Sequence, residues 1–266
     1  MPGFLFDFTQ ESPYVLVLIA LLAFVAGFVD AVVGGGGLIQ LPALLIAFPS
    51  LPLPVLFGTN KIAGFSGTLA ATFRYARRIR FDVPVLAVMA SCCFAASFAG
   101  ARLVSYLDST RLKPVILLLL LIMAVYTGLN KNLGTGQKEE RSRRGQMVYG
   151  GLLSLIVGFY DGFFGPGTGS FFVLGFVAIL GFEFVKASAY AKVVNCVTNL
   201  SALLVFISKG YYLLPLAVLM TVFNVGGSYL GSHLALKKGN AFVRVVFLVI
   251  VSLMICRFGY DVLQTF

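Results

Sequence analysis

The sequence predicts an all-α polytopic membrane protein built from two inverted-topology repeats of about five transmembrane helices each, with helices broken by glycine. Two observations predict this fold. First, 59% of the residues are hydrophobic and only 11% are charged, and the mean hydropathy is +0.96, whereas soluble domains carry about 25% charged residues. Second, the chain repeats itself at an offset of 131 positions. Such repeated halves are typical of secondary transporters.

The repeat is clearest at polar residues that stand within apolar sequence. The stretch Gly27-Phe28-Val29-Asp30 returns as Gly158-Phe159-Tyr160-Asp161, and each copy is followed by a run rich in glycine. The same offset carries Lys61 onto Lys192, with no gap between these matches. Apolar segments match by chance more easily than aspartate and lysine do, so we interpret the match as a true internal repeat.

Five apolar segments per half are long enough, or nearly so, for the roughly 20 residues that a membrane-spanning helix needs. They are expected at 14–33, 38–56, 60–76, 83–105 and 112–130, and again at 147–164, 169–182, 187–208, 213–236 and 242–263. The apolar runs do not alternate with polar residues, which argues against a β-barrel. The expected organisation is a first repeat at 1–130, a cytoplasmic linker at 131–146 and a second repeat at 147–266.

Each segment is bounded by residues that interrupt an apolar helix. The first and sixth end at glycine runs, and the second and seventh begin there. The third ends at a cluster of arginines, the fifth at the charged linker, and the ninth at Lys237 and Lys238. Segments 38–56 and 169–182 are short, so half-helices or re-entrant pieces are the alternative to full spans there.

The net charge of +10 is best interpreted as a topology signal, because cytoplasmic loops of membrane proteins collect Lys and Arg. With both termini outside and the linker inside, thirteen of the twenty Lys and Arg residues face the cytoplasm, five lie outside and two lie in spans. An odd number of spans per half makes the repeats inverted. If 38–56 and 169–182 do not cross, each half has four spans and the repeats are expected to be parallel.

Consecutive glycines in a membrane helix break it and expose backbone N–H groups. The breaks at Gly34–Gly37 and Gly165–Gly169 each precede a new apolar segment, and the N-terminus of a helix favours anions. We therefore expect an anion site that includes Gly36, Gly37, Thr168, Gly169 and Ser170. Loss of the hydroxyl in Thr168→Val is expected to weaken anion affinity. The alternative is that the glycines only permit close helix packing.

Two lysines at membrane depth are costly and therefore suggest function. Lys61 follows Thr59 and Asn60, and Lys192 shares one helical face with Asn195 and Asn199. These residues are expected to line the substrate route, and Lys192→Ala is expected to abolish transport while leaving the fold intact, because Lys192 has no evident fixed partner. The alternative is that each lysine reaches an interface or pairs structurally with an aspartate.

Asp30 and Asp161 are the symmetric acids, with a structural or a proton-coupling role. The four cysteines lie in apolar runs without metal-ligand spacing, and the sequence offers no nucleophile–base pair. An enzyme, a metal site, a cofactor and a nucleic-acid partner are therefore not expected. The expected partners are a small anionic substrate and the lipid bilayer, and an oligomer is compatible with the sequence.

The paired motifs resemble those of the sulfite exporter TauE/SafE family. The resemblance rests on Gly27–Ile39 with Pro42 and Gly58-Thr59-Asn60-Lys61 in the first half, and on Asp161–Ser170 with Lys192, Asn195 and Asn199 in the second. It implies a bacterial inner-membrane permease that exports small organosulfur or sulfur oxyanions, such as sulfite or sulfoacetate, by alternating access. An anion channel that uses the same lysines for selectivity is the alternative.

Overall fold

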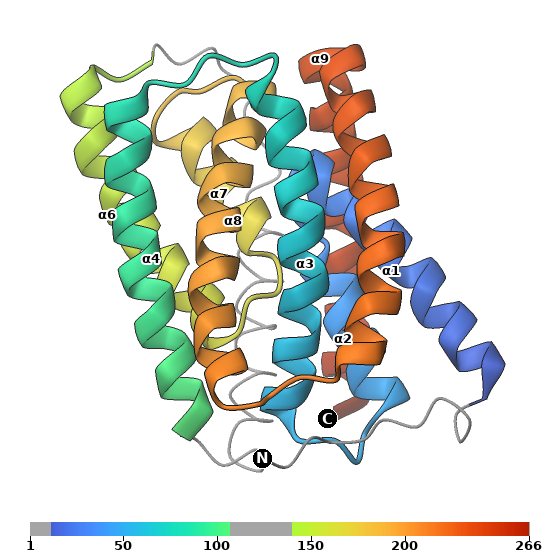
Figure 1. Cartoon of the computed structure of the whole chain (residues 1–266). Coiled ribbons are helices and arrows are strands. Elements are labelled where there is room, and N and C mark those ends of the chain that lie inside the picture. Colours follow the sequence, from blue (N-terminus) through green and yellow to red (C-terminus); the bar gives the residue numbers. More distant parts are fainter. Residues whose placement is uncertain (1–11, 107–139, 266) are drawn as a thin grey trace.

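The computed structural model describes residues 12–106 and 140–265, and within these ranges the elements are all helices (Figure 1). The expected fifth segment, 112–130, and most of the expected linker, 131–139, lie outside the described residues. The helices are α1 (Pro13–Val33), α2 (Gly37–Ala47), α3 (Leu53–Ala76), α4 (Val83–Tyr106), α6 (Arg143–Phe163), α7 (Thr168–Ala178), α8 (Phe184–Ser208) and α9 (Leu214–Thr265), the last interrupted by non-helical backbone at Gly239.

The helix boundaries follow the sequence repeat. α2 and α7 begin and end 131 positions apart, and the starts of α3 and α8, and of α4 and α9, differ by the same offset. Prolines near the starts of α1, α3, α4 and α9 favour initiation there, because proline at the first helical positions loses no hydrogen bond. α6 already begins at Arg143, inside the expected linker.

α2 and α7 are half-helices. Each has 11 residues, which corresponds to about 16 Å at 1.5 Å per residue, about half of the hydrocarbon thickness of about 30 Å. Four helices of the described part are long and apolar enough to cross a membrane: Pro13–Val33, Val83–Tyr106, Phe184–Ser208 and Leu214–Val243. Segments 38–56 and 169–182 therefore contain half-helices, the alternative to full spans.

The chain folds back on itself at the first glycine break. Ile19 near the start of α1, Leu44 near the end of α2 and Val55 at the start of α3 belong to one buried cluster. Thus α1 and α2 together return the chain to the end of the molecule where α1 begins. The sequence-based expectation was that the two halves are parallel if 38–56 does not cross the membrane. A short α2 does not by itself have this consequence, because α1 and α2 together bring α3 back to the end where α1 begins. In Figure 1, α3 and its counterpart α8 run in opposite directions.

The helices form two bundles that each mix the two sequence halves. One bundle holds α1, α2, α3 and α9, and the other holds α6, α7, α8 and α4. Glycine allows the exchanged helices to pack closely at equivalent points. A Cβ on Gly100 of α4 would lie 2.3 Å from the Phe159 oxygen of α6, and one on Gly231 of α9 would lie 2.4 Å from the Phe28 oxygen of α1. The two sequence repeats are therefore not the packing units.

Basic residues gather where α3 ends and where α6 and α8 begin, at one end of the molecule (Figure 1). Two ion pairs connect elements there. Arg143 of α6 contacts Asp82 before α4 at 2.9 Å, and Lys186 of α8 contacts Glu140 at 2.7 Å. The Arg143 guanidinium holds the pKa of the Asp82 carboxyl below its ordinary value by hydrogen bonding. The cationic end expected for the cytoplasmic side is thus present in the fold.

Candidate functional site

The two glycine breaks meet backbone to backbone at the interface of the bundles. Gly34 has φ 84°, and its carbonyl accepts the Ser170 N–H at 3.1 Å. A Cβ on Gly34 would lie 2.1 Å from the carbonyl carbon of Gly169. A side chain cannot fit in this contact, and positive φ favours glycine. Close packing, the alternative explanation for the glycines, therefore applies at Gly34 and Gly169.

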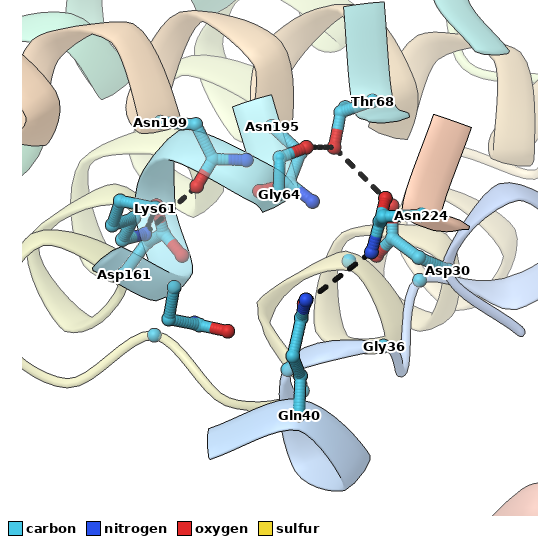
Figure 2. Close-up of a pocket in the computed structure, with 16 residues that line it drawn as sticks. Asp30, Gly36, Gln40, Lys61, Gly64, Thr68, Asp161, Asn195, Asn199 and Asn224 are labelled. Carbon is cyan, nitrogen blue, oxygen red and sulfur yellow. Dashed lines mark hydrogen bonds and ion pairs between the residues drawn. The ribbon is translucent and has the colours of Figure 1, made fainter. Parts of the chain in front are cut away.

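Beside this contact lies a cavity with a water-accessible volume of about 40 Å³. Residues of both bundles line it, as Figure 2 shows. Nine of the thirteen residues expected from the sequence are among the lining residues, which are Asp30, Gly34, Gly36, Gly37, Gln40, Asn60, Lys61, Gly64, Thr68, Asp161, Gly165, Gly167, Gly169, Asn195, Asn199 and Asn224.

Four expected site residues lie outside this lining: Thr59, Thr168, Ser170 and Lys192. The Thr59 hydroxyl donates to the Val55 carbonyl at 2.7 Å. The Thr168 hydroxyl donates to the Gly165 carbonyl at 2.6 Å, and the Ser170 hydroxyl to the Val33 carbonyl at 3.0 Å. The Thr168 and Ser170 hydroxyls thus stabilise the glycine breaks. Direct contact of Thr168 with an anion stays a prediction, and this bond counts against it.

The two lysines pair crosswise with the aspartates of the opposite half. Lys61 Nζ lies 2.6 Å from Asp161 Oδ2, and Lys192 Nζ lies 2.9 Å from Asp30 Oδ2. Each pair joins one bundle to the other, since Lys61 and Asp30 belong to the first bundle and Asp161 and Lys192 to the second. Any sliding of the bundles against each other must therefore act on both ion pairs.

Lys192 has fixed partners, so the expectation that it lacks one is wrong. It is fully buried, and its ammonium donates to both the carbonyl and the carboxylate of Asp30. That carboxylate also accepts from the Thr68 hydroxyl at 3.3 Å. Removal of one member of a buried pair leaves an uncompensated charge and costs about 3–5 kcal/mol. Lys192→Ala is therefore expected to affect folding as well as transport.

Lys61 is the lysine at the cavity. Besides Asp161, its ammonium donates to the Asn199 side-chain oxygen at 2.9 Å (Figure 2). It lines the cavity together with Asn60 and Asn195. The four charges of the two ion pairs balance, which explains how two lysines are tolerated at membrane depth. An anion that enters the cavity must therefore compete with the Asp161 carboxylate for the Lys61 ammonium.

Amide side chains form the largest group of polar residues around the cavity, and two of them were missed in the sequence. Asn224 of α9 donates to the Gln40 side-chain oxygen at 3.3 Å. The Gln40 side-chain nitrogen and the Asn60 side-chain oxygen are buried and have no hydrogen-bond partner in the described part of the chain. Both missed amides stand within apolar segments, and a polar residue at that depth is the signal that could have found them. The cavity is also lined by five further residues that had not been singled out as site residues, namely Gly34, Gly64, Thr68, Gly165 and Gly167.

The cavity offers amide and backbone donors, the Lys61 ammonium, and the Asp30 and Asp161 carboxylates that are paired with the two lysines. Among the described residues no group of three or more His, Cys, Asp or Glu could hold a metal ion. α2 begins at Gly37 against the cavity, and a helix N-terminus carries about half a positive charge. The N–H groups of Leu38, Ile39 and Gln40 donate to the Gly35 and Gly36 carbonyls. The arrangement therefore suits a small anion.

Comparison with known proteins identifies the family of the chain. Residues 19–258 match the family Sulfite exporter TauE/SafE. The chain belongs to the sulfite exporter TauE/SafE family. The "Probable membrane transporter protein ORF9" of Sinorhizobium sp is 39% identical over 90% of both chains, and the "Probable membrane transporter protein YfcA" of Escherichia coli (strain K12) is 36% identical over 94% of this chain and 91% of its own. No solved structure matches the chain.

A more distant relative of this TauE/SafE chain is the "Probable membrane transporter protein MJ0441" of Methanocaldococcus jannaschii, with 24% identity over 92% of this chain and 95% of its own. The family and these relatives identify a multi-pass membrane transporter rather than an enzyme.

Proposed function

We propose that this TauE/SafE protein is a secondary transporter that exports small sulfur oxyanions, such as sulfite or sulfoacetate, across the bacterial inner membrane by alternating access. The observation that carries the proposal is the cavity between the bundles. There a lysine, five carboxamides and a helix N-terminus surround a space enclosed by two glycine breaks. Anionic oxygens are the natural acceptors for this set of donors.

The size of the cavity favours a compact anion. A buried water needs about 10–15 Å³ of water-accessible volume, so about 40 Å³ corresponds to roughly three waters. That is room for an ion of a few heavy atoms. A longer sulfonate such as sulfoacetate would need the cavity to widen, which movement of the bundles could supply.

Binding would begin with an exchange at Lys61. The anion would replace the Asp161 carboxylate at the ammonium, while Asn199 holds the lysine in place through its side-chain oxygen. Asn60, Asn195 and the N–H groups at Gly36, Gly37 and Gly169 complete the proposed set of ligands. Since the Lys61–Asp161 pair joins the two bundles, anion binding would also loosen their contact.

The two bundles would then move against each other. The opposite directions of α3 and α8 in Figure 1 and the matched helix boundaries support two inverted repeats of about five segments, with a fifth segment of the first repeat at 112–130. Both termini would lie outside and the basic end inside. Export could be driven by the membrane potential, worth about 2.3 kcal/mol per charge per 100 mV, or by a proton that moves with the anion.

A thermal-shift screen of the purified protein tests the substrate class. Ligands that bind only the native state raise its apparent stability. We expect a shift with sulfite that rises with concentration, and none with a simple carboxylate such as butyrate or with the zwitterion taurine. The same protein in liposomes should then exchange internal for external labelled sulfite. Absence of any response to sulfur oxyanions would refute the proposal.

The liposome experiment also separates a carrier from a channel. A carrier saturates with substrate and shows counterflow, whereas currents of channel magnitude would indicate a pore that uses the same lysine for selectivity.

A further inference from the structure

The amide residues of the cavity break the symmetry of the two halves. At the offset of 131, the five cavity amides correspond to residues that are not amides. Gln40 corresponds to Phe171, Asn60 to Ala191, Asn195 to Gly64, Asn199 to Thr68 and Asn224 to Cys93. The repeated fold thus places hydrogen-bonding amides around the cavity that Lys61 lines, whereas Lys192 lies outside this lining.

The last turn of α1 shows a second break in symmetry. Donors of the other bundle satisfy its carbonyls: Lys192 donates to Asp30, the Ser188 hydroxyl donates to Val32 at 3.0 Å, and the Ser170 hydroxyl donates to Val33 at 3.0 Å. At the equivalent positions the first half carries Phe57 and Ile39, which have no side-chain donor. The equivalent last turn of α6 therefore cannot be held in this way.

Gln40 has the geometry of an unused ligand. It lines the cavity and is 3% exposed, its side-chain oxygen accepts from Asn224, and its side-chain nitrogen is buried without a partner in the described part of the chain. A buried donor without an acceptor costs about 1–3 kcal/mol. Because Asn224 fixes which end of the amide is turned away, the free end is the donor, and Figure 2 shows the side chain reaching from α2 toward the centre of the site.

We propose that the two half-sites have different roles. One anion binds between the Lys61 ammonium and the Gln40 amide donor, and the interactions of Lys192 with Asp30 join the two bundles permanently. This inference rests on the proposed function and deepens it, since it assigns a ligand and assigns the two lysines to different tasks. α1 stays held to α7 and α8 by donors to its backbone carbonyls, whereas the polar contact that the described residues show between α6 and α3 is the exchangeable Lys61–Asp161 pair.

The first test compares Gln40→Leu with the counterpart variant Phe171→Leu, using full-length purified protein and sulfite as the probe. A hydrogen bond to a charged group is worth about 1.5–3 kcal/mol, which is about a tenfold to hundredfold change in an equilibrium constant. Gln40→Leu is therefore expected to raise the sulfite dissociation constant by at least tenfold, and Phe171→Leu to change it by less than about twofold. If Gln40→Leu does not yield folded protein, Gln40→Met makes the same comparison.

The second test removes each ion pair without leaving a lone charge. Lys61→Met with Asp161→Asn is expected to fold and to lose sulfite binding. Lys192→Met with Asp30→Asn is expected to fold and to keep the dissociation constant within about threefold. Because Asp30 lines the cavity, Lys192→Arg is tested beside it, and this variant is expected to lower the melting temperature without changing sulfite affinity.

These outcomes separate the two proposals. A wild-type protein that does not respond to sulfite or to any other sulfur oxyanion overturns the proposed function. A wild-type protein that binds sulfite, with unchanged affinity in the Gln40 variant, overturns the role of Gln40. A folded Lys192 variant that has lost sulfite binding overturns the division of roles.

Discussion

Lys192→Ala should destabilise the protein strongly. The side chain is fully buried and contributes an ion pair to the Asp30 carboxylate and a hydrogen bond to its carbonyl. Without Lys192, the Asp30 carboxylate keeps only the Thr68 hydroxyl among its described partners, at 3.3 Å. A buried charge stripped of its partner costs about 3–5 kcal/mol. In a chain of this size about 1 kcal/mol shifts the melting temperature by about 2–4 °C, so a decrease of at least about 6 °C is expected.

The loss should come mostly from the aspartate that is left behind. Adding Asp30→Asn removes the orphan charge, so Lys192→Ala with Asp30→Asn should recover most of the melting temperature. The residual loss is expected to be about 1 kcal/mol, the usual worth of the hydrogen bond to the Asp30 carbonyl that is not restored. A double-mutant cycle therefore should give a coupling energy well above the value of an exposed ion pair, which is at most about 1 kcal/mol.

Melting temperature in detergent, followed by size-exclusion chromatography of the heated sample, measures this cycle. Lys186→Ala is the matched control, because Lys186 also pairs with an acid but lies at the exposed basic end, and it should change the melting temperature by less than about 2 °C. If Lys192→Ala melted with the wild type, or if Asp30→Asn added further loss instead of recovery, the ion pair would not hold the bundles together.

Two further predictions concern the second glycine break and the topology. Thr168→Val should leave sulfite affinity unchanged, because the Thr168 hydroxyl donates to the Gly165 carbonyl. Weaker affinity in this variant would show that the hydroxyl leaves Gly165 for the anion. Gly167→Ala should impair folding or transport, because φ at Gly167 is 79° and favours glycine. The topology is tested with a membrane-impermeant thiol reagent added outside the cell. It should label Ser50→Cys, in the exposed turn before α3, and should not label Arg78→Cys, after α3. The reverse pattern would invert the proposed orientation.

The repeat made much of the fold predictable. Polar residues that recur at one offset located equivalent helices, and proline and glycine marked where helices begin and break. For α2 and α7 the sequence left two alternatives open, a half-helix and a full span. Glycine at the start of each and the short apolar run that follows suit both. What decided between them is the placement of Leu44 of α2 and Ile19 of α1 in one buried cluster, a long-range arrangement that local sequence does not specify.

The site was predictable in its position and only partly in its partners. Aspartate and lysine at membrane depth require compensation, so some pairing of Asp30, Lys61, Asp161 and Lys192 was foreseeable. The crossed pairing was not, because it depends on α3 facing α6 and α8 facing α1 across the two bundles, which local sequence does not specify. Gln40 was missed because no lysine stands near it in the sequence, whereas Asn60, Asn195 and Asn199 accompany Lys61 and Lys192.

Internal symmetry determines where equivalent residues lie, and differences between equivalent residues indicate that they have different roles. Ser188 and Phe57 occupy equivalent positions on α8 and α3, yet only the serine can donate to the broken helix that faces it. A transporter with two identical half-sites would hold both broken helices equally and would have no reason to release one first. The donors that hold α1 are directed at its backbone carbonyls, whereas we propose that the Lys61–Asp161 pair exchanges with an anion. On this proposal, the unequal residues give the protein one place where binding and movement of the bundles are coupled.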